Sequence, residues 1–244
     1  MKKTMTMKMA KVSKRWLRGV SFALALIIMV SGGMILNSAS TDAKAKTKYV
    51  ALTFDDGPST VTTKTALKAL KKYDAHATFF VVGNRVASGK KYIKKAIEQG
   101  CEIASHSWDH TNLAKLSLAQ VNKHFEKTAK AVKKAADYDV KLLRPPYGAV
   151  STTMKKKFEH PMILWDVDTL DWKYRNTPSI MKYIKREVND GSIILMHDIH
   201  KTSVDSLNTV LKWLKKHHYE VVTVSELATI KGVELDKGVY CNIK

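Results

Sequence analysis

Short, nearly continuous apolar runs alternate with longer amphipathic stretches from Lys48 to the end of the chain. Such runs are typical of parallel strands that other elements cover on both faces, and the stretches between them repeat apolar residues at helical spacing. The predicted strands are 49–54, 77–82, 101–105, 140–144, 162–167, 192–196 and 220–224. The predicted helices are 62–73, 91–100, 117–135, 177–191, 203–217 and 225–230.

Residues at the ends of these stretches support the helices. Ser117 can cap one helix, Thr177 can cap another with Pro178 directly after it, and Gly100 and Gly191 stand where helices stop. Roughly seven strand–helix units predict an α/β fold, either a βα barrel or a doubly wound open sheet. No low-complexity linker divides this body, so a single domain is expected.

The first 45 residues follow another pattern. A basic stretch precedes an apolar run over 19–36, and small residues follow it. This order is typical of an export signal, with cleavage after Ser40 or Ala45, although the run is also long enough for an uncleaved membrane anchor. We therefore expect residues 1–45 to be a cytoplasmic basic stretch with a signal peptide or anchor. Residues 46–244 would be a monomeric exported domain, extracellular or in the cell wall, with membrane contact only through the N-terminal segment.

The formal net charge of +20 is unusual for a globular protein of 244 residues. Residues 1–48 hold ten Lys and Arg against the single acid Asp42, which leaves 32 basic and 21 acidic residues in the remainder. A basic body suits a polyanionic setting such as a bacterial wall, although a solvated lysine-rich surface gives the same count. A nucleic-acid partner is not expected, because the lysines scatter along predicted helices and no basic-aromatic motif occurs.

Two cysteines, Cys101 and Cys241, are too few for a disulfide scaffold. Export would allow them to pair, but idle thiols are the expectation, and the sequence alone leaves pairing open. No Cys-x-x-Cys motif supports a thiolate zinc site.

Polar clusters follow five of the predicted strands. They are Asp55-Asp56, "SHSWDH" (105–110), "RPPYG" (144–148), "DVDTLDW" (166–172) and "LMHD" (195–198). Taken alone, each cluster also has an ordinary structural explanation, such as a turn, a stiff loop or a surface histidine pair. Sites in α/β folds form at the carboxyl ends of strands, so five clusters at such ends predict one shared pocket.

The adjacent carboxylates of Asp55 and Asp56 point to a cation. Neighbouring strand residues face opposite ways, so these two share a site only if the strand ends there, and a Gly-Pro pair supplies that end. Two nearby carboxylates repel unless a cation neutralises them. His106, His110 and one Asp would form a two-His, one-carboxylate set that suits zinc, iron, cobalt, nickel or manganese. The second carboxylate can then act as a general base toward water.

In this order "TFDDGPS", "HSWDH", "RPPYG", "DTLDW" and "LMH" resemble the five motifs of the NodB-homology polysaccharide deacetylases, carbohydrate esterase family four. The resemblance covers roughly residues 49–227. It implies a distorted, incomplete βα barrel of about seven parallel strands. It also assigns Asp55 as catalytic base and Asp56, His106 and His110 as ligands of one divalent metal, zinc being expected, with cobalt, nickel or manganese as alternatives.

The resemblance implies roles for the other motif residues. Arg144 would hold Asp55 charged and oriented, and His197, its pKa tuned by Asp171, would be the general acid that protonates the departing amine. The backbone N–H of Tyr147 would help to stabilise the oxyanion. The residues expected to shape the substrate groove are Pro145, Tyr147, Trp172 and Leu195.

Together these observations predict an exported, metal-dependent N-deacetylase of a GlcNAc-containing wall polysaccharide, with peptidoglycan expected. A chitooligosaccharide or exopolysaccharide deacetylase, or an acetylxylan esterase, would use the same residues. An iron oxygenase could use the same ligands, but the βα pattern disfavours it. A non-catalytic wall-binding protein needs neither a base nor an acid, so Asp55 and His197 disfavour that class.

Overall fold

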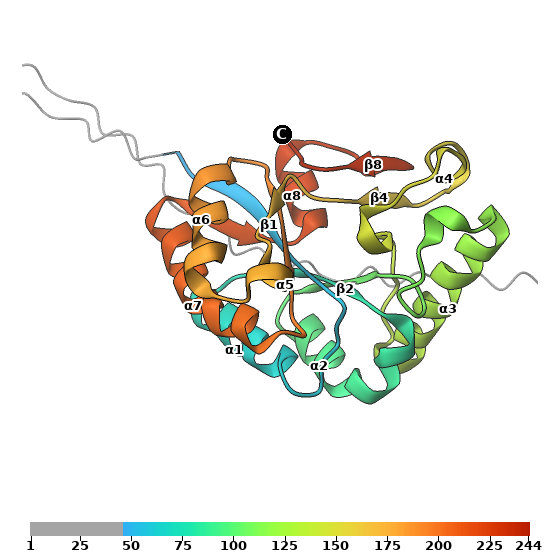
Figure 1. The fold of residues 1–244 in the computed structure, drawn as a ribbon, viewed down its shortest axis with the longest axis horizontal. Coiled ribbons are helices and arrows are strands. Elements are labelled where there is room, and N and C mark those ends of the chain that lie inside the picture. The colour runs from blue at the N-terminus through green and yellow to red at the C-terminus, as the bar shows by residue number, and fades with distance from the viewer. Residues whose placement is uncertain (1–45) are drawn as a thin grey trace, which may run out of the picture. The chain divides into compact units, whose positions relative to one another are not determined.

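Strands and helices alternate along residues 46–244, which are the residues that the computed structural model describes (Figure 1). The strands are β1 (Lys48–Asp55), β2 (Thr78–Val81), β3 (Glu102–Ser105), β4 (Pro161–Ile163), β5 (Val167–Asp168), β6 (Ile193–His197), β7 (Tyr219–Val222) and β8 (Gly238–Tyr240). The α-helices are α1 (Thr63–Tyr73), α2 (Val86–Glu98), α3 (Leu118–Ala136), α4 (Thr152–Lys157), α5 (Asp171–Tyr174), α6 (Thr177–Glu187), α7 (Lys201–Lys216) and α8 (Val224–Lys231). Three 3₁₀ helices are η1 (Gly83–Arg85), η2 (Leu113–Lys115) and η3 (Pro146–Gly148). The order confirms the predicted α/β class.

The sheet curls into a distorted barrel. Its strands pair in parallel in the order β3-β2-β1-β6-β5, and β7 pairs with the amino half of β1. Beyond β3, single bridges join Ser105 to Leu143 and Leu143 to Met162 of β4. Because β4 and β5 are successive parts of the segment 161–168, this segment closes the ring between the Leu143 bridge and β6.

Alternate residues of the strands enter two separate apolar cores. Val50, Leu52 and Phe54 of β1 pack in the larger core with residues of the surrounding helices. Ala51 lies in a smaller core with Ile193 and other inward-facing strand residues. Burial on both faces explains the nearly continuous apolar runs of the sequence. Side chains alternate between the two faces of a strand, so Asp55, four residues after Ala51, faces the same way as Ala51. Its side chain therefore points into the barrel interior, at the carboxyl end of β1.

Helices α6, α7, α1, α2 and α3 pack one against the next around the outside of the sheet (Figure 1). The predicted cap of α3 is confirmed, because Ser117 and Gln120 form a reciprocal capping box. The predicted cap of α6 is wrong by one residue. The Asn176 side chain accepts the backbone N–H of Ser179, and Thr177 is the first helical residue.

Three details of the predicted strand pattern are wrong. Only Leu143 of the predicted strand 140–144 pairs, because Pro145 and Pro146 follow at once and offer no N–H to extend a ladder. The predicted strand 162–167 divides into β4 and β5. β8 was not predicted, since its three residues are too few to give a periodic signal.

The predicted export segment lies outside the described residues. Within residues 46–244 no helix combines the length and the apolarity needed to cross a bilayer. Cys101 is buried and Cys241 exposed, and both are free thiols in the structure. Burial raises the pKa of Cys101 to about 11, so its thiol stays protonated.

Candidate active site

The five polar clusters meet at the carboxyl ends of the strands, as the sequence predicts. Asp55 ends β1 and His197 ends β6, and the register of the two strands pairs these residues directly. His106 follows β3, Arg144 follows the Leu143 bridge, and Asp171 begins α5 next to β6. The barrel topology therefore brings residues that are far apart in the sequence into one site.

Asp56, His106 and His110 form a compact group of possible metal ligands. One donor atom from each residue lies within 4.8 Å of the others. Asp56 Oδ1 lies 3.2 Å from His110 Nε2 and 3.6 Å from His106 Nε2. This carboxylate oxygen is buried and accepts no hydrogen bond from any of the residues 46–244, so a bound cation would satisfy it. Within residues 46–244 no other group of three such side chains is this close.

Unusual backbone conformations aim these side chains into the site. The strand ends after Asp55, and Asp56 has a φ of 72°, in the left-handed region. This turn reverses the usual alternation, so that both carboxylates face His106. His110 also has a positive φ, 66°. Aspartate and histidine enter the left-handed region more readily than most residues other than glycine.

The protonation states suit a metal site. His106 Nδ1 lies 2.7 Å from the carbonyl oxygen of Arg144, to which it can donate, and this leaves Nε2 free to bind a cation. Burial lowers the pKa of His106, which keeps the ring neutral. Burial alone would raise the pKa of Asp56, but the nearby His110, His106 and His197 lower it to about 2. The donor set is therefore two imidazoles and a charged carboxylate, which suits a divalent transition metal.

Asp55 is buried and paired with Arg144. Arg144 Nη1 donates to Asp55 Oδ1 at 2.8 Å and to Thr53 Oγ1 at 2.7 Å. Its Nε and Nη2 donate to the backbone carbonyls of Ile163 and Leu164. The guanidinium lies over the Phe80 ring, 4.1 Å from its centroid, inside the barrel. These contacts fix the guanidinium, which in turn fixes Asp55.

The Asp171–His197 pair lies at the end of β6, where His197 stands opposite Asp55 in the strand register. Asp171 Oδ1 lies 2.9 Å from His197 Nδ1, and Asp171 Oδ2 accepts the backbone N–H of His197 at 2.8 Å. Burial alone would lower the pKa of His197. The hydrogen bond and charge of Asp171, together with Asp55 and Asp56, outweigh burial and raise this pKa to about 9. His197 is therefore protonated at neutral pH and can act as an acid.

The predicted groove residues differ in exposure. Tyr147 is 69% exposed and Trp172 is 46% exposed, and the Tyr147 ring packs edge-on against His110 at 4.8 Å. Pro145 and Leu195 are buried, and Leu195 lies on the same strand face as His197. The exposed rings can contact a ligand directly, whereas the substrate contacts expected of Pro145 and Leu195 stay a prediction.

Sequence reasoning missed three buried side chains beside the site. Thr53 holds Arg144, and Asp198 and Thr63 bond to each other behind the Asp55-Asp56 turn. Burial raises the pKa of Asp198 to about 7. Thr53 belongs to the segment "TFDDGPS" and Asp198 to the segment "LMHD". Their position inside these motifs could have marked them as candidates for the site. Thr63 had no signal, because only the fold brings it to Asp198.

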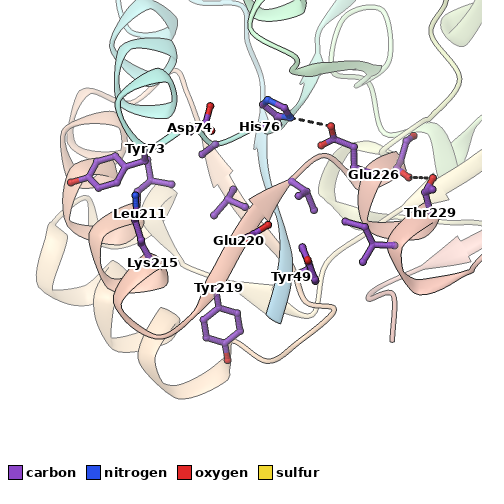
Figure 2. Close-up of a pocket in the computed structure, with 15 residues that line it drawn as sticks. Tyr49, Tyr73, Asp74, His76, Leu211, Lys215, Tyr219, Glu220, Glu226 and Thr229 are labelled. Carbon is purple, nitrogen blue, oxygen red and sulfur yellow. Dashed lines mark hydrogen bonds and ion pairs between the residues drawn. The ribbon is translucent and has the colours of Figure 1, made fainter. Parts of the chain in front are cut away.

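A large hollow lies elsewhere, at the amino ends of β1 and β7. It has a volume of about 810 Å³ and is lined by residues such as Tyr49, Tyr219 and His76. Figure 2 shows His76 turned toward Glu226, with His76 Nδ1 and Glu226 Oε1 3.0 Å apart. The hollow contains none of the predicted site residues. Its size therefore does not identify the active site.

Comparison with known proteins identifies similar sequences. A family model described as polysaccharide deacetylase matches residues 42–160. The peptidoglycan-N-acetylglucosamine deacetylase PgdA of Listeria monocytogenes is 47% identical over 185 residues, which are 75% of this chain and 40% of PgdA. The peptidoglycan-N-acetylmuramic acid deacetylase PdaC of Bacillus subtilis is 40% identical over 184 residues, 75% of this chain and 39% of PdaC. The chain thus spans about 40% of the length of these two relatives.

A solved structure matches the fold. A family 4 acetyl xylan esterase from Clostridium thermocellum, in complex with a cobalt ion, superposes with a TM-score of 0.77 at 35% sequence identity. The match covers 80% of this chain and 99% of that protein.

Proposed function

This chain belongs to the polysaccharide deacetylase family, carbohydrate esterase family four, and from that premise we propose that it hydrolyses N-acetyl groups of a cell-wall polysaccharide and releases acetate. One observation carries the proposal. In the donor group Asp56, His106 and His110, His106 Nε2 lies 3.6 Å from Oδ2 of Asp55, and Asp55 pairs with Arg144 and stands opposite His197, the partner of Asp171, in the β1–β6 register. Base, metal ligands and acid are thus arranged around one point, as amide hydrolysis requires.

In this proposal Asp56, His106 and His110 hold one divalent ion, with zinc as the proposed metal. The unpartnered Asp56 Oδ1 and the free Nε2 of His106 support it. The cobalt ion of the acetyl xylan esterase shows that a relative of this fold binds such a metal. When bound, the ion would polarise the acetyl carbonyl and lower the pKa of water.

The protein side chains would move the protons. Asp55, held by Arg144, accepts a proton from the attacking water. His197, protonated and oriented by Asp171, donates a proton to the nitrogen of the departing amine. The backbone N–H of Tyr147 is proposed to bind the oxyanion, and the rings of Tyr147 and Trp172 to contact the sugar. Asp55 and His197 are neighbours in the β1–β6 register, so both can reach one amide.

A wall polymer is the proposed substrate. The relatives PgdA and PdaC are named for N-acetylglucosamine and N-acetylmuramic acid of peptidoglycan, and GlcNAc is our proposal for this chain. The predicted export segment and the basic body support a wall location. Residues 46–244 would then be the catalytic domain, and residues 1–45 would direct export or anchor the protein.

The direct test is acetate release. The purified protein is incubated with peptidoglycan, acetylated chitooligosaccharides and acetylxylan, with and without a chelator. We expect acetate from peptidoglycan, loss of release after chelation, and recovery when zinc or cobalt is added back. Faster release from acetylxylan would instead assign an esterase. Wall binding without any acetate release would assign a non-catalytic binding protein.

The pH profile tests the acid. His197 must be protonated to donate, so kcat/KM should fall as the pH rises through about 9, the raised pKa of His197. Asp171→Asn removes the negative charge that raises this pKa, so the fall should move about 1–3 pH units lower. Asp205→Asn, at an exposed acid of α7, is the control and should leave the profile unchanged. An Asp171→Asn profile that matches the parent would remove His197 from the acid role.

A further inference from the structure

Two loops of the candidate site must keep a fixed separation. The turn after β1 follows Asp55 and begins with Asp56, and the loop after β6 follows His197 and begins with Asp198. The β1–β6 hydrogen-bond ladder fixes the strands up to the Asp55–His197 pair and no further. Asp198, the first residue of the second loop, is fully buried and lies behind the first loop.

A chain of two hydrogen bonds joins these loops through α1. The backbone N–H of Ser59 donates to Thr63 Oγ1 at 2.7 Å, and Thr63 Oγ1 donates to Asp198 Oδ2. Thr63 is the first residue of α1 and is buried. The turn that begins with Asp56 is therefore tied to the residue adjacent to His197.

Gly57 shows how closely the two loops approach. A Cβ atom on Gly57 would lie 2.5 Å from Asp198 Oδ1 and 2.7 Å from Asp198 Oδ2. The Asp198 carboxyl thus fills the space that a side chain at position 57 would occupy. Asp198 Oδ1 is buried and has no hydrogen-bond partner within residues 46–244.

We propose that Thr63 and Asp198 are a positioning pair that fixes the Asp55-Asp56 turn relative to His197. The catalytic part of this inference rests on the proposed function. The metal ligand Asp56, which lies beyond the ladder, and the acid His197 must serve the same amide, and a misplacement of about 1 Å can reduce the rate 100-fold. The pair also holds the turn that places Asp56, so it supports metal binding in the same way.

Thr63→Val tests the pair, because valine keeps the shape of threonine and removes the hydroxyl. Thr62→Val is a matched control. Thr62 is the preceding residue, is only 6% exposed, and its Oγ1 has no hydrogen-bond partner within the described residues. Zinc affinity of the metal-free protein is measured by competition with a chromogenic chelator, alongside kcat, KM and the thermal midpoint. We expect Thr63→Val to weaken zinc binding and to lower kcat about 10- to 100-fold, with KM little changed. Thr62→Val should stay within about twofold of the parent.

A second pair of variants covers the case in which Thr63→Val does not fold. Asp198→Asn keeps an oxygen that can accept from Thr63, whereas Asp198→Ala removes it. We expect Asp198→Asn to recover most of the zinc affinity and kcat that Asp198→Ala loses. Equal losses in the two Asp198 variants, or a Thr63→Val protein identical to Thr62→Val, would overturn the positioning pair. The zinc measurement needs no substrate, so it tests the pair even if no acetate is released from any polymer.

Discussion

Asp55→Asn is expected to reduce kcat/KM for acetate release about 100- to 10,000-fold, the range that a general base contributes. Asparagine keeps an oxygen that can accept from Arg144 but cannot take a proton from water at neutral pH. Metal affinity should remain near that of the parent protein, because the proposed ligands are Asp56, His106 and His110. Steady-state acetate release measures the fall in kcat/KM, and competition with a chromogenic chelator measures the zinc affinity.

The control for Asp55→Asn is a check that the variant still folds and still binds metal. The Asp55→Asn protein should bind zinc stoichiometrically and keep a single cooperative unfolding transition. Acetate release at the parent rate from such a protein would remove Asp55 from the role of base. Lost zinc binding would instead place Asp55 among the ligands, since its Oδ2 also lies 3.6 Å from His106 Nε2.

Arg144→Met should lower both stability and activity. Arg144 is fully buried, and methionine would leave the Asp55 carboxylate and the carbonyls of Ile163 and Leu164 without their donor. Breaking a buried ion pair from one side costs about 3–5 kcal/mol. For a domain of this size the thermal midpoint should therefore fall by roughly 6–20 °C. Thermal unfolding followed by circular dichroism measures this shift.

Arg186→Met is the matched control for Arg144→Met. Arg186 is exposed on α6 and pairs with its neighbour Glu187, so its replacement should change the free energy of unfolding by no more than about 0.5 kcal/mol. Arg144→Lys distinguishes charge from shape, because lysine keeps the charge but cannot make the four contacts of the planar guanidinium. A lysine variant with parent stability would show that charge alone matters at this position.

The general location of the site could be predicted from local sequence. Each motif residue follows an apolar run, and the carboxyl ends of parallel strands share one edge of a sheet. Asp55, His106, Arg144 and His197 therefore had to come together once the runs were recognised as strands. The catalytic roles assigned to them remain proposals that the variants above test.

Other features could not be predicted from spacing. The sequence leaves open whether "RPPYG" is a strand, a stiff loop or a catalytic segment, and only the fold shows Arg144 inside the barrel beneath Asp55. The bend that divides 161–168 into β4 and β5 depends on which neighbours each half pairs with. Thr63 and Asp198 are 135 residues apart in the chain, and no periodic pattern connects them.

The sequence by itself determined the α/β class, the order of strands and helices, and the set of polar residues at the strand ends. These features follow from periodicity and residue type, which act over a few neighbouring positions. The tertiary structure decided the 2.8 Å contact between Asp55 and Arg144, the proximity of Asp56 to two histidines, and the raised pKa of His197. Distances, burial and electrostatic shifts depend on which distant segments pack together, and closure of the barrel sets that packing.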